Sequence, residues 1–255
     1  MNRERLGWMT GSLLVAAGFA VLWHAVCAMQ WVSPVYLPSP GAVAAALADG
    51  FRQGNLAELA LGTIAHMVYG WLLATLLGIV LGTLIGVSPS ARAWLQPTLE
   101  YIRPLPASAV VPVAIALFGL SPAMVLGVIA FGAVWPVLLA SIHGFAVIEP
   151  RLIETARMLR MSRLAFIWKI GLPNALPDIL SGARLSLTVA LVLSVVGEML
   201  ASQEGLGMAI LVASRGYQSA DLFAGVVLLS LIGYVSDTAL KNAERRFLRW
   251  RLRQD

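Results

Sequence analysis

Charge is scarce in this sequence, because Asp, Glu, Lys and Arg together make up only 12% of its 255 residues. That is about half the fraction found in an ordinary soluble domain. Hydrophobic residues make up 59%, so the chain has too little polar surface to cover itself in water. The composition argues against a soluble protein. The net charge of +5 does not indicate nucleic-acid binding, because the basic residues lie between apolar runs and near the C-terminus, as in membrane-protein loops.

Lysine and cysteine are almost absent. The two lysines, Lys169 and Lys241, are followed by Ile and Asn, so neither belongs to a phosphate-binding P-loop, which requires Lys followed by Ser or Thr. The single cysteine, Cys27, cannot form an internal disulfide and is expected to be a small buried hydrophobe. The three histidines are scattered without metal-ligand spacing, and no Ser, His and Asp set resembles a catalytic triad. We therefore assign no metal and no catalytic residue.

Six apolar segments are long enough to cross a bilayer, which takes about 20 helical residues. The sequence predicts an all-α polytopic membrane protein with six transmembrane helices and a single domain over residues 1–255. A cleaved signal peptide is the alternative for the first segment, but that apolar run is longer than a typical signal and no clear cleavage site follows it closely. A short amphipathic helix is expected over 41–51, and a glycine-bearing loop is expected over 201–220. The predicted spans are about 8–31, 62–87, 95–120, 122–145, 178–200 and 221–240.

Glycines recur along the second span, at Gly70, Gly78, Gly82 and Gly86. Steps of four and eight residues place them on one helical face. Close packing of helices in lipid requires such a face of small residues.

The third span contains Pro104, Pro106 and Pro112. Each proline removes a backbone donor, and two that lie so close cannot both occupy a regular helix. Broken backbone at membrane depth is tolerated only where protein or a water-filled cavity surrounds it. We therefore expect this segment to face the interior of a helix bundle.

The distribution of basic residues predicts the orientation. Six spans place both termini on one side of the membrane. If that side is the cytoplasm, fourteen Lys and Arg residues lie inside, and only Arg52 and Arg215 lie outside. The positive-inside rule therefore predicts cytoplasmic termini and a cytoplasmic loop over 146–177.

This loop carries a helical pattern. Leu152, Ala156 and Leu159 recur at helical spacing, with Ile153 and Arg160 flanking that face. From periodicity alone, a helix in the lipid headgroup region, with its basic side toward the phosphates, remains an open interpretation.

Proline and serine predict where two short helices in the loop begin and end. Pro150 suits the first turn of the first helix, and Ser162 suits the cap of a second helix that runs through Ile170. Pro173 and Pro177 are expected to stop it before the fifth span.

The loop resembles the signature of type I ABC-importer permeases, a Glu-Ala-Ala motif followed by a glycine and by Ile-x-Leu-Pro. Glu154, Thr155 and Ala156 match the first motif, with Thr155 in place of an alanine. Ile170, Leu172 and Pro173 match the second at the family's spacing. Arg160 stands where the family usually has a glycine that allows a tight turn, so the resemblance leaves the geometry of this turn open.

Other segments resemble the aliphatic-sulfonate, taurine and nitrate branch of these permeases. A dinucleotide interpretation of Gly-Leu-Gly at 205–207 fails, because that stretch follows a membrane helix and not a strand. The matching segments are LPSP at 37–40, YGWLLATLLGIVLGTLIG at 69–86, YIRPLPASAVVPVAIALFGL at 101–120, NALPDILSGARLSLTVALVLSVVGEML at 174–200 and GLGMAI at 205–210.

The resemblance implies a non-catalytic permease subunit of the bacterial inner membrane. It implies a second permease copy in a homodimer, two ABC ATPase subunits that use ATP and Mg, and a periplasmic or lipid-anchored binding protein. The cargo is expected to be a sulfonate, taurine or nitrate, with heterocyclic precursors left open. The residues expected to couple the loop to the ATPase are Glu154, Thr155, Ala156, Leu159, Arg160, Ile170, Leu172 and Pro173.

Three charged residues lie within or near spans, which makes each a functional hypothesis by default. Arg103, Arg184 and Glu198, together with Pro104 and Pro106, are candidates for the translocation path or its gate. The alternatives are snorkelling of the arginines toward headgroups and a structural role for Glu198 against a neighbouring helix.

Two other classes of function fit the sequence less well. A secondary transporter or channel with Glu198 as its ion site would show repeated halves, and we find no such repeat. A membrane-embedded enzyme would need a cluster of His, Asp or Glu at membrane depth, and the sequence predicts no such cluster.

Overall fold

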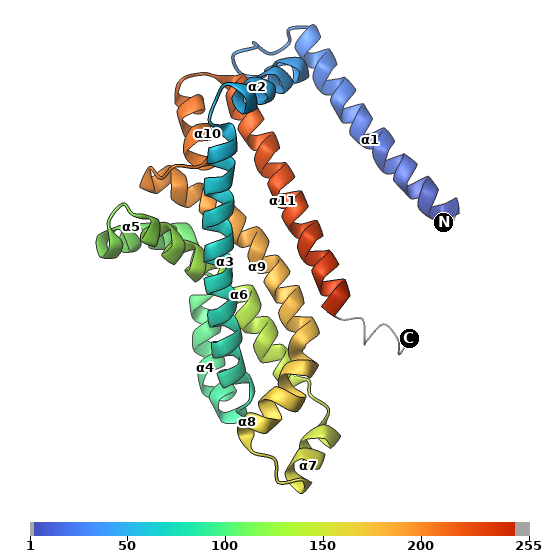
Figure 1. Cartoon of the computed structure of the whole chain (residues 1–255), viewed down its shortest axis with the longest axis vertical. Coiled ribbons are helices and arrows are strands. Elements are labelled where there is room, and N and C mark those ends of the chain that lie inside the picture. Colours follow the sequence, from blue (N-terminus) through green and yellow to red (C-terminus); the bar gives the residue numbers. More distant parts are fainter. Residues whose placement is uncertain (1–2, 248–255) are drawn as a thin grey trace.

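The computed structural model describes residues 3–247, which form helices and turns only and so confirm the all-α prediction (Figure 1). In chain order the elements are α1 (Arg3–Ala28), α2 (Pro40–Arg52), α3 (Leu56–Gly86), α4 (Pro89–Ile102), α5 (Ala107–Phe118), α6 (Pro122–Ala146), α7 (Pro150–Met158), α8 (Arg163–Phe166), the π-helical turn η1 (Ile167–Gly171), α9 (Leu172–Ala201), α10 (Leu206–Arg215) and α11 (Ser219–Phe247).

Four helical segments are long and apolar enough to cross a membrane: α3, α6, α11 and the continuous stretch Arg163–Ala201. The pair α4 and α5 adds a fifth span if it is counted as one. In α1, residues Ala17–Ala28 form a shorter apolar helix by the same measure. The described residues thus give four or five spans, and the six-span count stays a prediction.

The core of the bundle consists of α3, α6 and α9, which pack side by side (Figure 1). The glycine face of α3 lies against α6, as the spacing predicted. A Cβ atom at Gly82 would lie 2.4 Å from Cβ of Ser141 and 2.8 Å from the carbonyl oxygen of Leu138. Only a residue without a side chain permits this approach, so the glycines set the distance between the two helices.

One partly buried and one buried hydrogen bond join α9 to the other core helices. The indole N–H of Trp71 on α3 donates to the carbonyl of Ala183 at 2.8 Å. The hydroxyl of Ser186 donates to the carbonyl of Ala133 on α6 at 2.6 Å. In lipid, such bonds fix the rotation of one helix against the next.

The third predicted span is broken where the prolines predicted a break. α4 ends at Ile102, Pro106 precedes α5, and the two helices are bent by 92°. Among residues 3–247, which the structure describes, no residue of α4 is buried, and α5 buries only Val111 and Ala114. The expected interior position therefore holds for one face of α5 but not for α4.

The expectation that Pro173 and Pro177 stop the helix before the fifth span is wrong. The helix continues from α8 through η1 into α9, with Pro173 in the first turn of α9 and Pro177 inside it. In η1 the N–H of Leu172 donates to the carbonyl of Ile167, five residues earlier. A π-turn of this kind widens the helix, and it does so where the proline ring would otherwise meet the preceding turn.

The region between the last two membrane-spanning segments, α9 and α11, also differs from expectation. Residues 201–220 were expected to form a loop, but they contain α10. The short helix expected over 41–51 is confirmed as α2, capped by Ser39, whose Oγ accepts from the N–H of Ala42 at 3.2 Å. In Figure 1, α2 and α10 lie at one end of the bundle, and α7 and α8 lie at the other.

Candidate functional site

The segment between α6 and α9 folds into two short helices, α7 and α8, at one end of the bundle (Figure 1). Pro150 occupies the first turn of α7, as predicted. Ser162 caps α8, and its Oγ accepts from the N–H of Ala165 at 3.2 Å. The sequence therefore located both helix starts correctly.

Arg160 adopts the left-handed conformation that a glycine would supply at the end of α7, with φ of +50°. Its N–H donates to the carbonyl of Arg157, and the N–H of Met161 donates to the carbonyl of Ala156, each at 3.0 Å. These two bonds form a complete Schellman motif, which normally favours glycine at this position. The arginine thus keeps the tight turn and carries the strain that a glycine would avoid.

The inner side of the loop is packed against the ends of the long helices. Ile153, Phe166 and Ile170 contact a cluster built on Phe145 of α6 and Ala175 of α9, and Leu172 at the start of α9 packs against the same cluster. Ala156 is also buried. The predicted apolar stripe is therefore divided, since Ala156 faces the protein while Leu152 and Leu159 are exposed.

The loop also carries large apolar side chains that no other part of residues 3–247 covers. We call Met158, Leu159, Leu164 and Trp168 the outer apolar face; they are 86%, 70%, 69% and 68% exposed. Glu154 and Thr155 are exposed on α7, and the hydroxyl of Thr155 donates to the carbonyl of Arg151. The arrangement leaves an anchored segment that carries several exposed apolar side chains.

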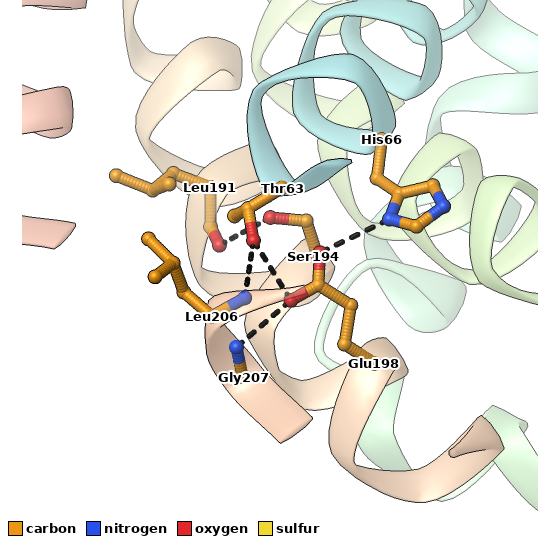
Figure 2. Close-up of polar contacts among 7 residues, drawn as sticks. All are labelled: Thr63, His66, Leu191, Ser194, Glu198, Leu206 and Gly207. Atoms are coloured by element: carbon orange, nitrogen blue, oxygen red, sulfur yellow. Dashed lines mark hydrogen bonds and ion pairs between the residues drawn. The ribbon is translucent and has the colours of Figure 1, made fainter. Parts of the chain in front are cut away.

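A second polar site lies at the opposite end of α9, where Glu198 is completely buried (Figure 2). Its Oε2 accepts from the hydroxyl of Thr63 at 3.0 Å and from the N–H of Gly207 at 2.9 Å. Its Oε1 lies 3.0 Å from Nδ1 of His66. The hydroxyl of Thr63 accepts in turn from the N–H of Leu206 at 2.8 Å. We call these groups the Glu198 cluster.

The Glu198 cluster joins three helices. Thr63 and His66 come from α3, Glu198 comes from α9, and the two N–H groups belong to the first turn of α10. A carboxylate is well placed at a helix N-terminus, whose first N–H groups have no partner inside the helix. Because all four contacts are internal and Glu198 is not exposed, the geometry favours the structural alternative for this residue over an ion site or an open gate.

The two arginines within the spans have different surroundings. Arg184 on α9 lies 3.9 Å from Asp237 and 3.7 Å from Glu244, both on α11. It therefore joins α9 to α11. Arg103 lies just after α4 and lines a pocket with residues of α6 and α9.

Comparison with known proteins identifies the family. Residues 74–249 match the model of the family described as the binding-protein-dependent transport system inner membrane component. The chain belongs to this family. It is an ABC-importer permease subunit, and ATP hydrolysis in this family is carried out by a separate ATPase.

Relatives of this permease extend over almost its whole length. It is 34% identical over 250 residues to the aliphatic sulfonates transport permease protein SsuC of Bacillus subtilis (strain 168), covering 98% of this chain and 90% of that protein. It is 28% identical to the taurine transport system permease protein TauC of Escherichia coli (strain K12), covering 98% and 95%.

A solved structure of the inward-facing MetNI methionine ABC transporter matches the permease with a TM-score of 0.66 and 19% identity. The match covers 77% of this chain and 96% of that chain. This likeness shows the type I importer fold.

Sequence reasoning missed the partners of Glu198 in this permease. A buried carboxylate in a span needs a partner, and Thr63 and His66 are three residues apart on another span, so they share a face. That spacing was a usable signal. The contribution of α10 gave no such signal, because its N–H groups are backbone atoms and α10 itself was expected to be a loop.

Proposed function

We propose that two copies of this permease form the translocation path of an importer for small organic anions that carry a sulfonate group. Two relatives support this substrate class by their names, one for aliphatic sulfonates and one for taurine, whose shared chemistry is a sulfonate on a short carbon chain. Nitrate is the competing cargo. An arginine placed where the third span breaks suits an anion of either kind.

The outer apolar face supports the second part of the proposal, which is the contact with the ATPase. Exposed apolar side chains that cluster on an anchored segment mark a protein contact. We infer that each loop binds one ABC ATPase subunit, which uses ATP and Mg, through this face together with Glu154 and Thr155. The backbone of Arg160 contributes to this coupling by forming the turn between α7 and α8. Ile153, Ala156, Ile170 and Leu172 keep the loop attached to α6 and α9, so movement of the ATPase reaches the spans.

The opposite end of the bundle is then the outer end, where a periplasmic or lipid-anchored binding protein delivers cargo. This orientation agrees with the charge bias of the sequence and puts both termini in the cytoplasm. A second permease copy is supported by α4 and α5, which the single chain leaves largely uncovered. We therefore expect the path to lie between two copies.

The test of ATPase binding uses a charge placed on the outer apolar face. Leu159→Asp and Glu154→Lys permeases are co-expressed with the cognate ATPase and purified through a tag on the permease. We expect much less ATPase to co-purify, and uptake into proteoliposomes to fall in parallel. Tyr217→Asp is the matched control for ATPase retention, because Tyr217 is 71% exposed at the other end of the bundle. Full retention of the ATPase by both loop variants would contradict the proposal.

A further inference from the structure

A pocket opens where α4 and α5 are bent apart, and it has a volume of about 390 Å³. Binding pockets for small molecules begin at about 300 Å³, so this volume suits a compact solute. On α6 the pocket is lined by residues between Gly132 and Pro136, and on α9 by residues between Thr188 and Leu193. Both stretches lie near the middle of helices long enough to span a membrane. The pocket is thus at membrane depth, beside a broken helix.

Its lining combines one cation with an apolar wall. Arg103 is the single charged residue among those that line the pocket. Thr188 adds a hydroxyl, and most other lining side chains are apolar, including Leu105, Val192 and Leu193. A lining of this kind would bind a molecule with an anionic end and a short hydrocarbon body.

The charge of Arg103 is not neutralised by a neighbouring carboxylate among residues 3–247, where the ion pairs formed by arginine involve Arg151 and Arg184. Arg184 shows the contrast, because two acidic side chains of α11 lie near it. A guanidinium at membrane depth without such a partner leaves its N–H donors available to an incoming anion. Guanidinium groups bind planar or tetrahedral oxyanions with two parallel hydrogen bonds.

We propose that this pocket is a substrate-binding site within the translocation path, in which Arg103 binds the anionic group and the wall formed by Val192 and Leu193 contacts the hydrocarbon part. Arg103 selects anions over cations at this point. The inference rests on the proposed function for its place in transport, but the charge preference of the pocket does not depend on which anion is the cargo.

The first experiment measures that charge preference directly. Cys27, the single native cysteine, is replaced by serine, and Val192, which is 58% exposed in the pocket, is replaced by cysteine. The purified permease–ATPase complex is treated with two thiol reagents of similar size, 2-sulfonatoethyl methanethiosulfonate and its trimethylammonioethyl counterpart. We expect the sulfonate reagent to react faster, and Arg103→Gln to lower the anion-to-cation rate ratio by about tenfold, as a unit charge at close range in a partly screened site implies.

The control is Arg92→Gln in the same Val192→Cys background, because Arg92 lies on α4 as well but does not line the pocket. It should leave the rate ratio unchanged. The proposal is overturned if Arg103→Gln leaves the ratio as it was, or if neither reagent labels the cysteine, since the pocket would then not face water.

The second experiment measures uptake of radiolabelled taurine and competition by ethanesulfonate, butanesulfonate and nitrate, in proteoliposomes with the full complex and its binding protein. Arg103→Gln should reduce uptake at least tenfold while stimulation of ATP hydrolysis by the loaded binding protein is kept, and Arg103→Lys should restore part of the uptake. If the wild type takes up nitrate but not taurine, and Arg103→Gln abolishes the nitrate uptake, the sulfonate assignment is refuted and the proposed site is retained. Uptake by Arg103→Gln within twofold of wild type would refute the site and keep the proposed function.

Discussion

Oε1 of Glu198 on α9 lies 3.0 Å from Nδ1 of His66 on α3, in a place where the carboxylate is completely buried (Figure 2). The other carboxylate oxygen accepts from Thr63 and from the N–H of Gly207. The pair therefore lies within a set of bonds that attaches the first turn of α10 to two core helices. This arrangement indicates that Glu198 holds together the end of the bundle where α10 lies.

Removal of the Glu198 carboxylate should destabilise the permease. Glu198→Ala leaves the N–H of Gly207 and the side chains of Thr63 and His66 without their partner, and a loss of this kind costs about 2–4 kcal/mol. We expect a lower melting temperature in detergent and less folded protein on size-exclusion chromatography. Glu100→Ala on the exposed side of α4 is the control and should melt like the wild type.

Glu198→Gln separates a structural role from an ionic one. Its amide oxygen can accept the bonds from Thr63 and Gly207, and its amide N–H can donate to His66 when Nδ1 carries no proton. We expect stability and uptake close to those of the wild type. A stable Glu198→Gln permease that transports nothing would show that the charge itself is needed.

A methyl group at Gly205 should disturb the same cluster from the other side. A Cβ at this position would lie 2.3–2.6 Å from the carboxyl group of Glu198. Gly205→Ala must therefore displace either the carboxylate or the start of α10, and we expect a loss of about 1–3 kcal/mol, seen as a lower melting temperature. Gly216→Ala is the matched control, because its nearest neighbour would be at 3.4 Å. Equal behaviour of the two variants would argue against the observed packing.

Arg160→Gly should stabilise the loop. The residue has φ of +50°, and the left-handed region costs a non-glycine residue about 1–2 kcal/mol that glycine does not lose. We expect slower proteolysis within residues 150–170 and no loss of uptake. Arg160→Ala removes the charge but keeps the strain, so it should not be protected. Faster cleavage of the glycine variant than of the wild type would show that the arginine side chain holds the turn.

The glycine face of α3 should also tolerate no added side chain at Gly82. Gly82→Ala places a methyl group 2.4 Å from Cβ of Ser141, so α3 and α6 must separate. We expect this overpacking to cost about 1–3 kcal/mol in the free energy of unfolding. Gly18→Ala on α1 has no neighbour within 4 Å and should be neutral. The two variants are compared by thermal unfolding in the same detergent.

The local sequence pattern determined much of the secondary structure of this permease. The apolar runs predicted the positions of α3, α6, α9 and α11, because a bilayer demands about 20 apolar residues and backbone groups satisfied within the helix. Pro104 and Pro106 predicted the break of the third span. Pro150 and Ser162 predicted where the loop helices begin. In each case the residue acts on its own backbone, so its effect is visible without knowledge of the fold.

Tertiary structure alone decided the rest. Pro173 was expected to stop a helix, but a π-turn that packs against Phe145 accommodates it. Leu152, Ala156 and Leu159 were expected to share one apolar stripe, but Ala156 is buried while Leu152 and Leu159 are exposed. The partners of Glu198 include backbone N–H groups of a helix that periodicity did not reveal. These outcomes depend on which distant segments meet, and the free energy of such contacts is not encoded in the spacing of residues along one segment.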